Sequence, residues 1–128
     1  MNVQPTHIPS PNELFAYERL DAYRVAQEFL EISEVLAKRL PRTKGQLGDQ
    51  LTRASEAIGL RIAEGVGAEF RSADQKRYFR SARGSALECG AVLDICRARG
   101  VGSPDLLQRG RGLLLRIVQM LTRLARGP

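Results

Sequence analysis

The sequence predicts an all-α fold, an antiparallel up-down four-helix bundle. Four long segments carry apolar residues at three- and four-residue steps, and no segment shows the two-residue alternation of a strand. Short stretches rich in proline, glycine or serine separate these segments. A chain of 128 residues is long enough to bury one core, so we expect one domain, residues 18–128, after an irregular tail, residues 1–17. The helices are expected at about 19–40, 46–64, 72–99 and 104–125.

The first two helices are expected to end at residues that disfavour helix. Pro41 stops the first, because proline lacks the backbone N–H that a helix needs, and Gly65 and Gly67 end the second. One face of each carries the helical repeat. The repeats are Tyr23, Ala26, Leu30, Ser33, Ala37 and Leu40 in the first helix, and Leu47, Leu51, Ala54, Ile58 and Ile62 in the second.

The last two helices begin with capping residues. Ser72 and Gln75 form the S-x-x-Q pattern of a capping box, and Gly100 ends that helix. Ser103 is a favoured N-cap, and Pro104 follows it at the first helical position. The apolar positions are Tyr78, Phe79, Ala82, Ala86, Cys89, Leu93 and Cys96 in the third helix, and Leu106, Leu107, Leu113, Leu114, Ile117, Leu121 and Leu124 in the fourth.

The stretch ARGSALECG, residues 82–90, raises the question of a catalytic serine. Ser85 and Glu88 lie three residues apart and are therefore neighbours on a helix. The single histidine, His7, lies in the tail, and the G-x-S-x-G spacing of a nucleophile elbow is absent. A carboxylate alone is a poor base for a serine hydroxyl at neutral pH. We therefore expect no catalytic residue and no enzyme activity.

The glycines of the same stretch favour packing. A glycine inside a helix costs ~1 kcal/mol relative to alanine, so Gly84 and Gly90 suggest that another element approaches closely. Residues 82, 86, 89 and 93 share one face, and residues 84, 87 and 91 share another. We expect the first face to cover the core and the second to meet a neighbouring helix or subunit.

Two ionisable groups lie beside the apolar stripe of the second helix, Arg53 and Glu64. If the second and third helices form a hairpin centred near residues 68–69, position 53 lies opposite position 84. Arg53 can then reach Ser85 or Glu88. We expect a semi-buried Arg53–Glu88 ion pair with a hydrogen bond from Ser85, which would fix the register of the hairpin more than it stabilises the fold.

Cofactor, metal and membrane functions find no support in the sequence. Cys89 and Cys96 lie roughly 10 Å apart along one helix, too far for a disulfide, and no nearby histidine completes a zinc site. No phosphate-binding glycine loop is present. No apolar run approaches the ~18 residues that span a bilayer, and the N-terminus lacks the pattern of a secretory signal. We expect a cytoplasmic protein without cofactor or membrane contact.

The charge of the chain points to an anionic partner. The formal net charge is +6 and the pI is about 10.0, and residues 97–128 alone carry seven basic groups and one acidic group. Arginine suits phosphate because its planar fork bonds two oxygens. The candidate nucleic-acid-binding residues recur at helical spacing in the last two helices: Arg109, Arg116, Arg123 and Arg126, with Lys76, Arg80 and Arg83. The alternative is a basic but idle surface, since 17 of the 20 basic residues are arginine and genome composition alone produces such a bias.

Two stretches resemble a known family. QLTRASEAIGLRIAEGVG (50–67) and YFRSARGSALECGAVLD (78–94) follow the pattern Q-L-x-R-A, N-I-A-E-G and A-x-G-S-x-x-E. This pattern is similar to that of the four-helix-bundle family named after the 23S ribosomal RNA intervening-sequence protein. The accessory variability determinant protein of diversity-generating retroelements belongs to the same group. Arg61 stands where asparagine is usual, and Gly59 replaces a frequent proline.

The resemblance implies more than the spacing does. It implies a bundle that assembles as a ring, typically a homopentamer, and in the retroelement relatives the basic ring binds nucleic acid and a reverse transcriptase. We therefore expect a non-enzymatic oligomeric accessory protein that binds the RNA or DNA backbone. The alternative is a structural assembly module that docks a protein partner without nucleic acid.

Overall fold

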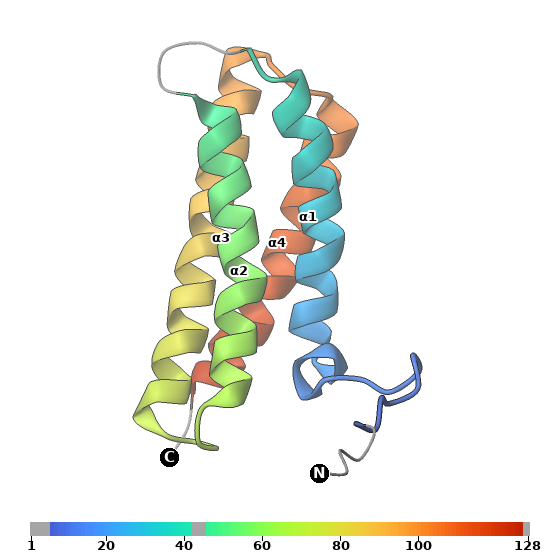
Figure 1. Ribbon diagram of the computed structural model, residues 1–128. Helices are drawn as coiled ribbons and strands as arrows, with labels where there is room; N and C mark the ends of the chain where they lie inside the picture. The colour runs from blue at the N-terminus through green and yellow to red at the C-terminus, as the bar shows by residue number, and fades with distance from the viewer. Residues whose placement is uncertain (1–5, 42–45, 127–128) are drawn as a thin grey trace.

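Four long helices form the bundle shown in Figure 1. The computed structural model describes residues 6–41 and 46–126, and no strand occurs in these ranges. A 3₁₀ turn, η1 (Ala16–Arg19), precedes the helices. These are α1 (Asp21–Arg39), α2 (Leu47–Gly67), α3 (Ala73–Arg99) and α4 (Pro104–Ala125). Residues 1–5 of the expected tail and residues 127–128 of the expected domain lie outside the described ranges.

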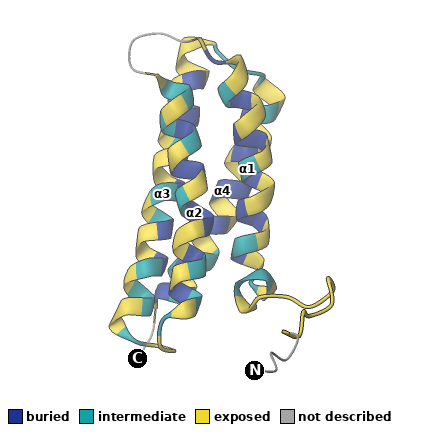
Figure 2. Ribbon diagram, in the orientation of Figure 1, coloured by how far each residue is buried: buried dark blue, intermediate teal, exposed yellow. Residues whose placement is uncertain are grey.

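Consecutive helices run in opposite directions and pack as neighbours (Figure 1). α1 contacts α2 and α4, and α3 contacts the same two helices, so the four surround a single core. In Figure 2 the buried residues form stripes along the inner faces. Every helix contributes side chains that are 0% exposed. They include Phe29 of α1, Ile58 of α2, Ala82 and Cys89 of α3, and Ile117 and Leu121 of α4. The fold class predicted from the sequence is confirmed as an all-α bundle of four helices.

The buried face of α1 differs from the expected one. Tyr23, Leu30 and Ala37 are only half-buried. The buried positions of α1 are Ala22, Val25, Ala26, Phe29, Ile32, Ser33 and Leu36. This face carries more large apolar side chains than the expected one and therefore removes more apolar surface from water.

Two hydroxyl groups lie inside the bundle between α1 and α2. Ser33 is 0% exposed and Ser55 is 2% exposed, and their Oγ atoms are 2.9 Å apart. Each Oγ is also within donating distance of a carbonyl on its own helix, Leu30 at 2.8 Å for Ser33 and Thr52 at 3.0 Å for Ser55, and the two hydroxyl protons fill two of these three contacts at a time. Each buried hydroxyl thus keeps a partner, which avoids the cost of an unsatisfied polar group.

The junction between α2 and α3 follows the predicted cap and adds a tie. The Ser72 Oγ accepts a hydrogen bond from the Gln75 backbone N–H at 3.1 Å. The Gln75 side chain accepts from the Arg71 N–H at 2.8 Å and donates to the Gly65 carbonyl at 3.0 Å. The last bond joins the start of α3 to the final turn of α2.

α2 does not end at Gly65, where the sequence predicted its end. It continues to Gly67, and Gly65 is a point of close approach between α2 and α3. A Cβ at Gly65 would lie 2.7 Å from Cε1 of Phe79 and 3.2 Å from Cβ of Tyr78. The missing side chain therefore lets the buried Phe79 ring pack directly on α2.

Gly84 is the opposite case, since a Cβ there meets nothing within 4 Å, and the same holds for Gly90. In the described part of the chain no neighbouring helix therefore packs against these two glycines, and the expected contact with another subunit stays a prediction.

Alanine is expected to have opposite effects at these two glycines. Gly65→Ala should lower the free energy of unfolding by about 1–2 kcal/mol, because overpacking exceeds the gain in helix propensity. Gly84→Ala should raise it by up to ~1 kcal/mol. Urea denaturation followed by circular dichroism measures both, and a Gly65→Ala variant more stable than Gly84→Ala would contradict the packing described.

Candidate nucleic-acid interface

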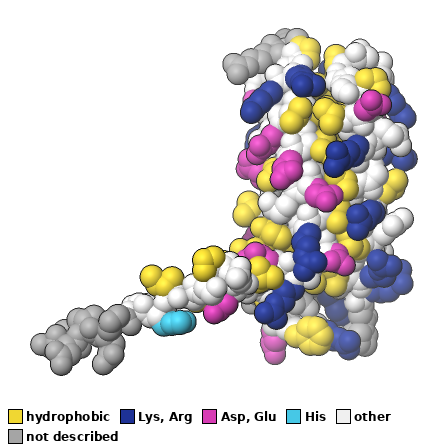
Figure 3. All heavy atoms as spheres, turned by 90° about the vertical axis from the view of Figure 1, so that its right-hand side faces the viewer, with side chains coloured by type: hydrophobic (Ala, Val, Ile, Leu, Met, Phe, Trp, Pro, Cys, Tyr) yellow, Lys and Arg dark blue, Asp and Glu magenta, His cyan; other side chains and the backbone are white. Residues whose placement is uncertain are grey.

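The outer face of α4 carries a row of arginines. Arg109, Arg116 and Arg123 are all exposed, and their seven-residue spacing places them on one side of the helix. Leu113, Leu114, Ile117 and Leu121 are buried on the other side. In Figure 3 the Lys and Arg side chains gather mostly toward the right of the view, and Asp and Glu mostly toward the left. The row spans roughly 14 residues of helix, which at a rise of 1.5 Å per residue is about 21 Å.

No ion pair compensates this row within the described part of the chain. The ion pairs found there all join residues three apart on α1, α2 or α3. They are Arg24–Asp21, Arg61–Glu64, Arg77–Asp74 and Arg97–Asp94. α4 itself carries one acidic residue, Asp105, at its start. The arginines of α4 therefore present their charge to solvent, where an anion can reach it.

The other four predicted contact residues lie where α3 begins and α4 ends. Arg83 donates from Nη1 to the Thr122 Oγ1 at 3.3 Å, so the two helices touch at this level. Arg80 is one turn before Arg83 and is exposed, and Arg126 is one turn after Thr122 and is exposed. Lys76 is half-buried on the same side of α3. The structure thus separates the predicted residues into the row on α4 and a cluster at one end of the bundle.

The predicted residues of α2 and α3 line a common hollow but do not pair. Arg53, Ser85 and Glu88 border a depression of about 470 Å³ together with Gln50. No ion pair joins Arg53 to Glu88, and no hydrogen bond joins Ser85 to either, so the expected semi-buried pair is wrong. Both charged side chains are exposed, and water solvates them well enough that little favours pairing. Glu64 pairs with Arg61 on its own helix instead.

The two cysteines are free and buried. Burial, with a smaller contribution from the Glu88 carboxylate, raises the pKa of the Cys89 thiol to about 12. Burial also raises the pKa of Cys96. Since the thiolate is the nucleophile, burial and the raised pKa values both lower the reactivity of these thiols. In the residues that the structure describes, no group of three His, Cys, Asp or Glu side chains is placed to hold a metal ion.

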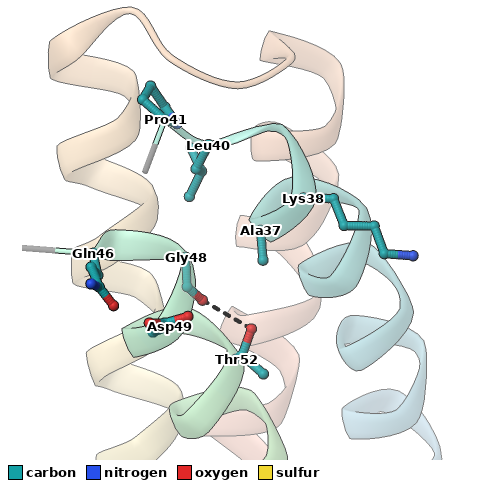
Figure 4. A pocket seen from close by; sticks show the side chains of 8 residues that line it. All are labelled: Ala37, Lys38, Leu40, Pro41, Gln46, Gly48, Asp49 and Thr52. Carbon is teal, nitrogen blue, oxygen red and sulfur yellow. Dashed lines mark hydrogen bonds between the residues drawn. The ribbon is translucent and has the colours of Figure 1, made fainter. Parts of the chain in front are cut away.

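A hollow lies between the end of α1 and the start of α2. Its volume is about 410 Å³, and Figure 4 shows its lining: Ala37, Lys38, Leu40, Pro41, Gln46, Gly48, Asp49 and Thr52. Lys38 points away from it (Figure 4), and the Thr52 hydroxyl donates to the Gly48 carbonyl at 2.9 Å. A Cβ at Gly48 would lie 3.1 Å from the Ala37 carbonyl oxygen, so glycine permits this close approach. We assign no ligand to it.

Sequence reasoning missed two surface features. Arg111 is exposed at the junction of α3 and α4. It was not predicted because it does not share the seven-residue spacing of Arg109, Arg116 and Arg123. Phe15, Tyr17 and Tyr23 form an aromatic cluster, with ring centroids 5.3 Å apart for the first pair and 4.7 Å for the second. The short spacing of Phe15 and Tyr17 was the available signal. Burial, then the neighbouring Tyr17 and Glu18, raises the pKa of Tyr23.

The fold and this surface define a four-helix bundle with an arginine-lined outer helix. The chain belongs to the 23S rRNA-intervening sequence protein family, whose sequence pattern matches residues 18–123. It is similar to the crystal structure of a protein of unknown function from the S23 ribosomal protein family of Bacteroides thetaiotaomicron. The TM-score is 0.74 at 19% sequence identity, over 83% of this chain and 99% of that one. No curated protein matches the chain. Within the described ranges, no helix is both long and apolar enough to cross a membrane.

Proposed function

We propose that this protein is a non-enzymatic accessory protein that binds the phosphate backbone of RNA or DNA. The observation that carries the proposal is the row of Arg109, Arg116 and Arg123, exposed on α4 without an ion pair in the described chain. A planar guanidinium bonds two phosphate oxygens at once. The row contains no aromatic residue for stacking on bases, so binding is directed to the backbone and weak in sequence preference.

Self-association is part of the proposal. The resemblance implies a ring, typically a homopentamer, and a ring multiplies the charge of +6 that each chain carries. Gly84 and Gly90 support this, because no described helix covers them and each disfavours the isolated helix. The retroelement relatives add a reverse transcriptase as the class of protein partner.

Salt-dependent binding tests the nucleic-acid role. The intact protein should bind generic duplex DNA and single-stranded RNA, measured by fluorescence anisotropy between 50 mM and 300 mM salt. Three phosphate contacts predict a log–log slope of roughly −2.7 or steeper with duplex DNA, because each contact releases condensed counterions. Absence of binding at 50 mM salt would reject the proposal.

The second candidate function is an assembly module that docks a protein partner without nucleic acid. The groove between α3 and α4 favours it, since Leu87 is 56% exposed and Leu115 is 46% exposed there. Light scattering and the binding assay separate the two candidates. An oligomer without affinity for RNA or DNA supports the module, and an oligomer with salt-sensitive affinity supports the accessory protein.

A further inference from the structure

An apolar groove runs along the outer junction of α3 and α4. It holds about 280 Å³ and is lined by Leu87, Gly90, Ala91, Asp94, Arg111, Leu114, Leu115 and Val118. The floor is open because a Cβ at Gly90 would meet nothing within 4 Å. Asp94 and Arg111 also line a second hollow of about 260 Å³ toward the α3–α4 turn, so the two hollows are adjacent.

The N-terminal arm, residues 6–15, has the complementary character. All ten residues are exposed, and the arm extends away from the bundle (Figure 3). Ile8 is 84% exposed, Phe15 is 68% exposed and Leu14 is 47% exposed. Pro9 and Pro11 restrict the backbone, which lowers the conformational entropy lost on docking. Such an arm gains free energy when its apolar side chains leave water.

Charge indicates how the arm and the groove fit together. Glu13 precedes Leu14 on the arm and forms no ion pair in the described chain, and Arg111 at the groove is likewise without one. The neighbouring carboxylate, Asp94, lies 3.9 Å from Arg97 and is thus partly compensated. A carboxylate brought to Arg111 by the arm would complement the charge of that arginine, and the pairing of Asp94 with Arg97 weakens the repulsion from the second acid.

We propose that the N-terminal arm of one copy docks in the α3/α4 groove of a second copy, with Ile8 and Leu14 as apolar anchors and Glu13 facing Arg111. The arm leaves the bundle at the start of α1, which packs on α2 and α4 but makes no contact with α3, and it extends away from the bundle (Figure 3). The inference rests on the self-association included in the proposed function and does not require nucleic acid.

Disulfide trapping tests the arm directly. Two full-length chains with different affinity tags are mixed, one carrying Leu14→Cys and the other Leu115→Cys, and are oxidised mildly. We expect a disulfide between the two tags. The matched control pairs Leu14→Cys with Val35→Cys, since Val35 is 39% exposed on α1 and lies outside the groove. The control should form at least tenfold less product. Cys89 and Cys96 are buried and should not compete.

Association strength gives an independent readout. Ile8→Ser with Leu14→Ser should weaken self-association by roughly 100-fold, about tenfold for each lost anchor. Val35→Ser should leave it unchanged. Light scattering over a range of concentrations measures both variants beside the parent chain.

Each outcome separates the arm from the assembly. A monomeric parent chain would overturn both the self-association and the arm. An oligomer without trapping at Leu115 above the control would overturn the arm alone. A chain carrying both cysteines that gives only the intramolecular disulfide would show that the arm covers its own groove, and would also overturn the inference.

Discussion

Replacing Arg109, Arg116 and Arg123 together with glutamine is expected to weaken binding to duplex DNA roughly 500-fold at 0.1 M salt. Each lost phosphate contact lowers the slope of log K against log salt by about 0.9, so three contacts lower it by about 2.7. Because 0.1 M salt is one logarithmic unit below 1 M, where these contacts contribute nothing, the affinity at 0.1 M falls by about 2.7 logarithmic units. For a single strand the slope per contact is about 0.7, and the expected loss is roughly 100-fold. Anisotropy titrations at several salt concentrations measure the affinity and the slope together. Glutamine keeps a helix propensity close to that of arginine, so folding should be unaffected.

A matched control distinguishes the α4 row from net charge. Arg19→Gln, Arg39→Gln and Arg99→Gln also lower the formal net charge from +6 to +3. All three arginines are exposed and lie on η1, α1 and α3. If binding depends on the row, this control should lose much less affinity and keep most of the slope. Equal losses in both triple variants would mean that diffuse charge, and not the α4 face, holds the nucleic acid.

The sequence was informative wherever local chemistry determines the structure. α4 begins at Pro104 as expected, because Ser103 accepts a hydrogen bond from the Leu106 N–H and proline fits the first helical position. α3 begins after Ser72 for the same kind of reason. Gly100 ends α3 in the left-handed conformation, with a φ of 68°. Each of these helix ends depends on a few residues that are adjacent in the chain, so it can be predicted from the sequence alone.

The errors arose where two helices must be placed relative to each other. Gly65 looked like a helix end, but the Phe79 ring occupies the space of its missing side chain. The expected Arg53–Glu88 pair needed the register between α2 and α3, which the sequence determines only to within a turn. Both side chains are exposed, so an ion pair between them would stabilise the fold little. The α3/α4 groove depends on interhelical spacing, and the direction of the arm depends on η1. None of these quantities can be read from periodicity.

The packing of α1 on α4 should be sensitive to one ring. Phe29 is 0% exposed, and Phe29→Ala is expected to lower the free energy of unfolding by about 3–5 kcal/mol through lost burial and the cavity left behind. That is a large part of the 5–15 kcal/mol typical of a domain. Urea denaturation at one fixed protein concentration measures it, since self-association also contributes to stability. If Phe29→Ala leaves too little folded protein, Phe29→Leu gives a smaller loss of the same sign.

Gly110 offers a test of where that cavity opens. A Cβ at Gly110 would lie 3.3 Å from Cε1 of Phe29 and 3.2 Å from Cδ1 of Leu93. In the parent chain this crowding offsets the ~1 kcal/mol that alanine gains over glycine in a helix, so Gly110→Ala alone should change stability little. Without the ring, the Leu93 side chain can shift into the space that the ring leaves, so the added methyl group is accommodated and fills part of the cavity. Gly110→Ala should then recover about 1 kcal/mol or more in the Phe29→Ala background. If its effect is equal in both backgrounds, within the roughly 0.3–0.5 kcal/mol expected of independent sites, then the ring does not lie against Gly110 and the placement of α1 on α4 is wrong.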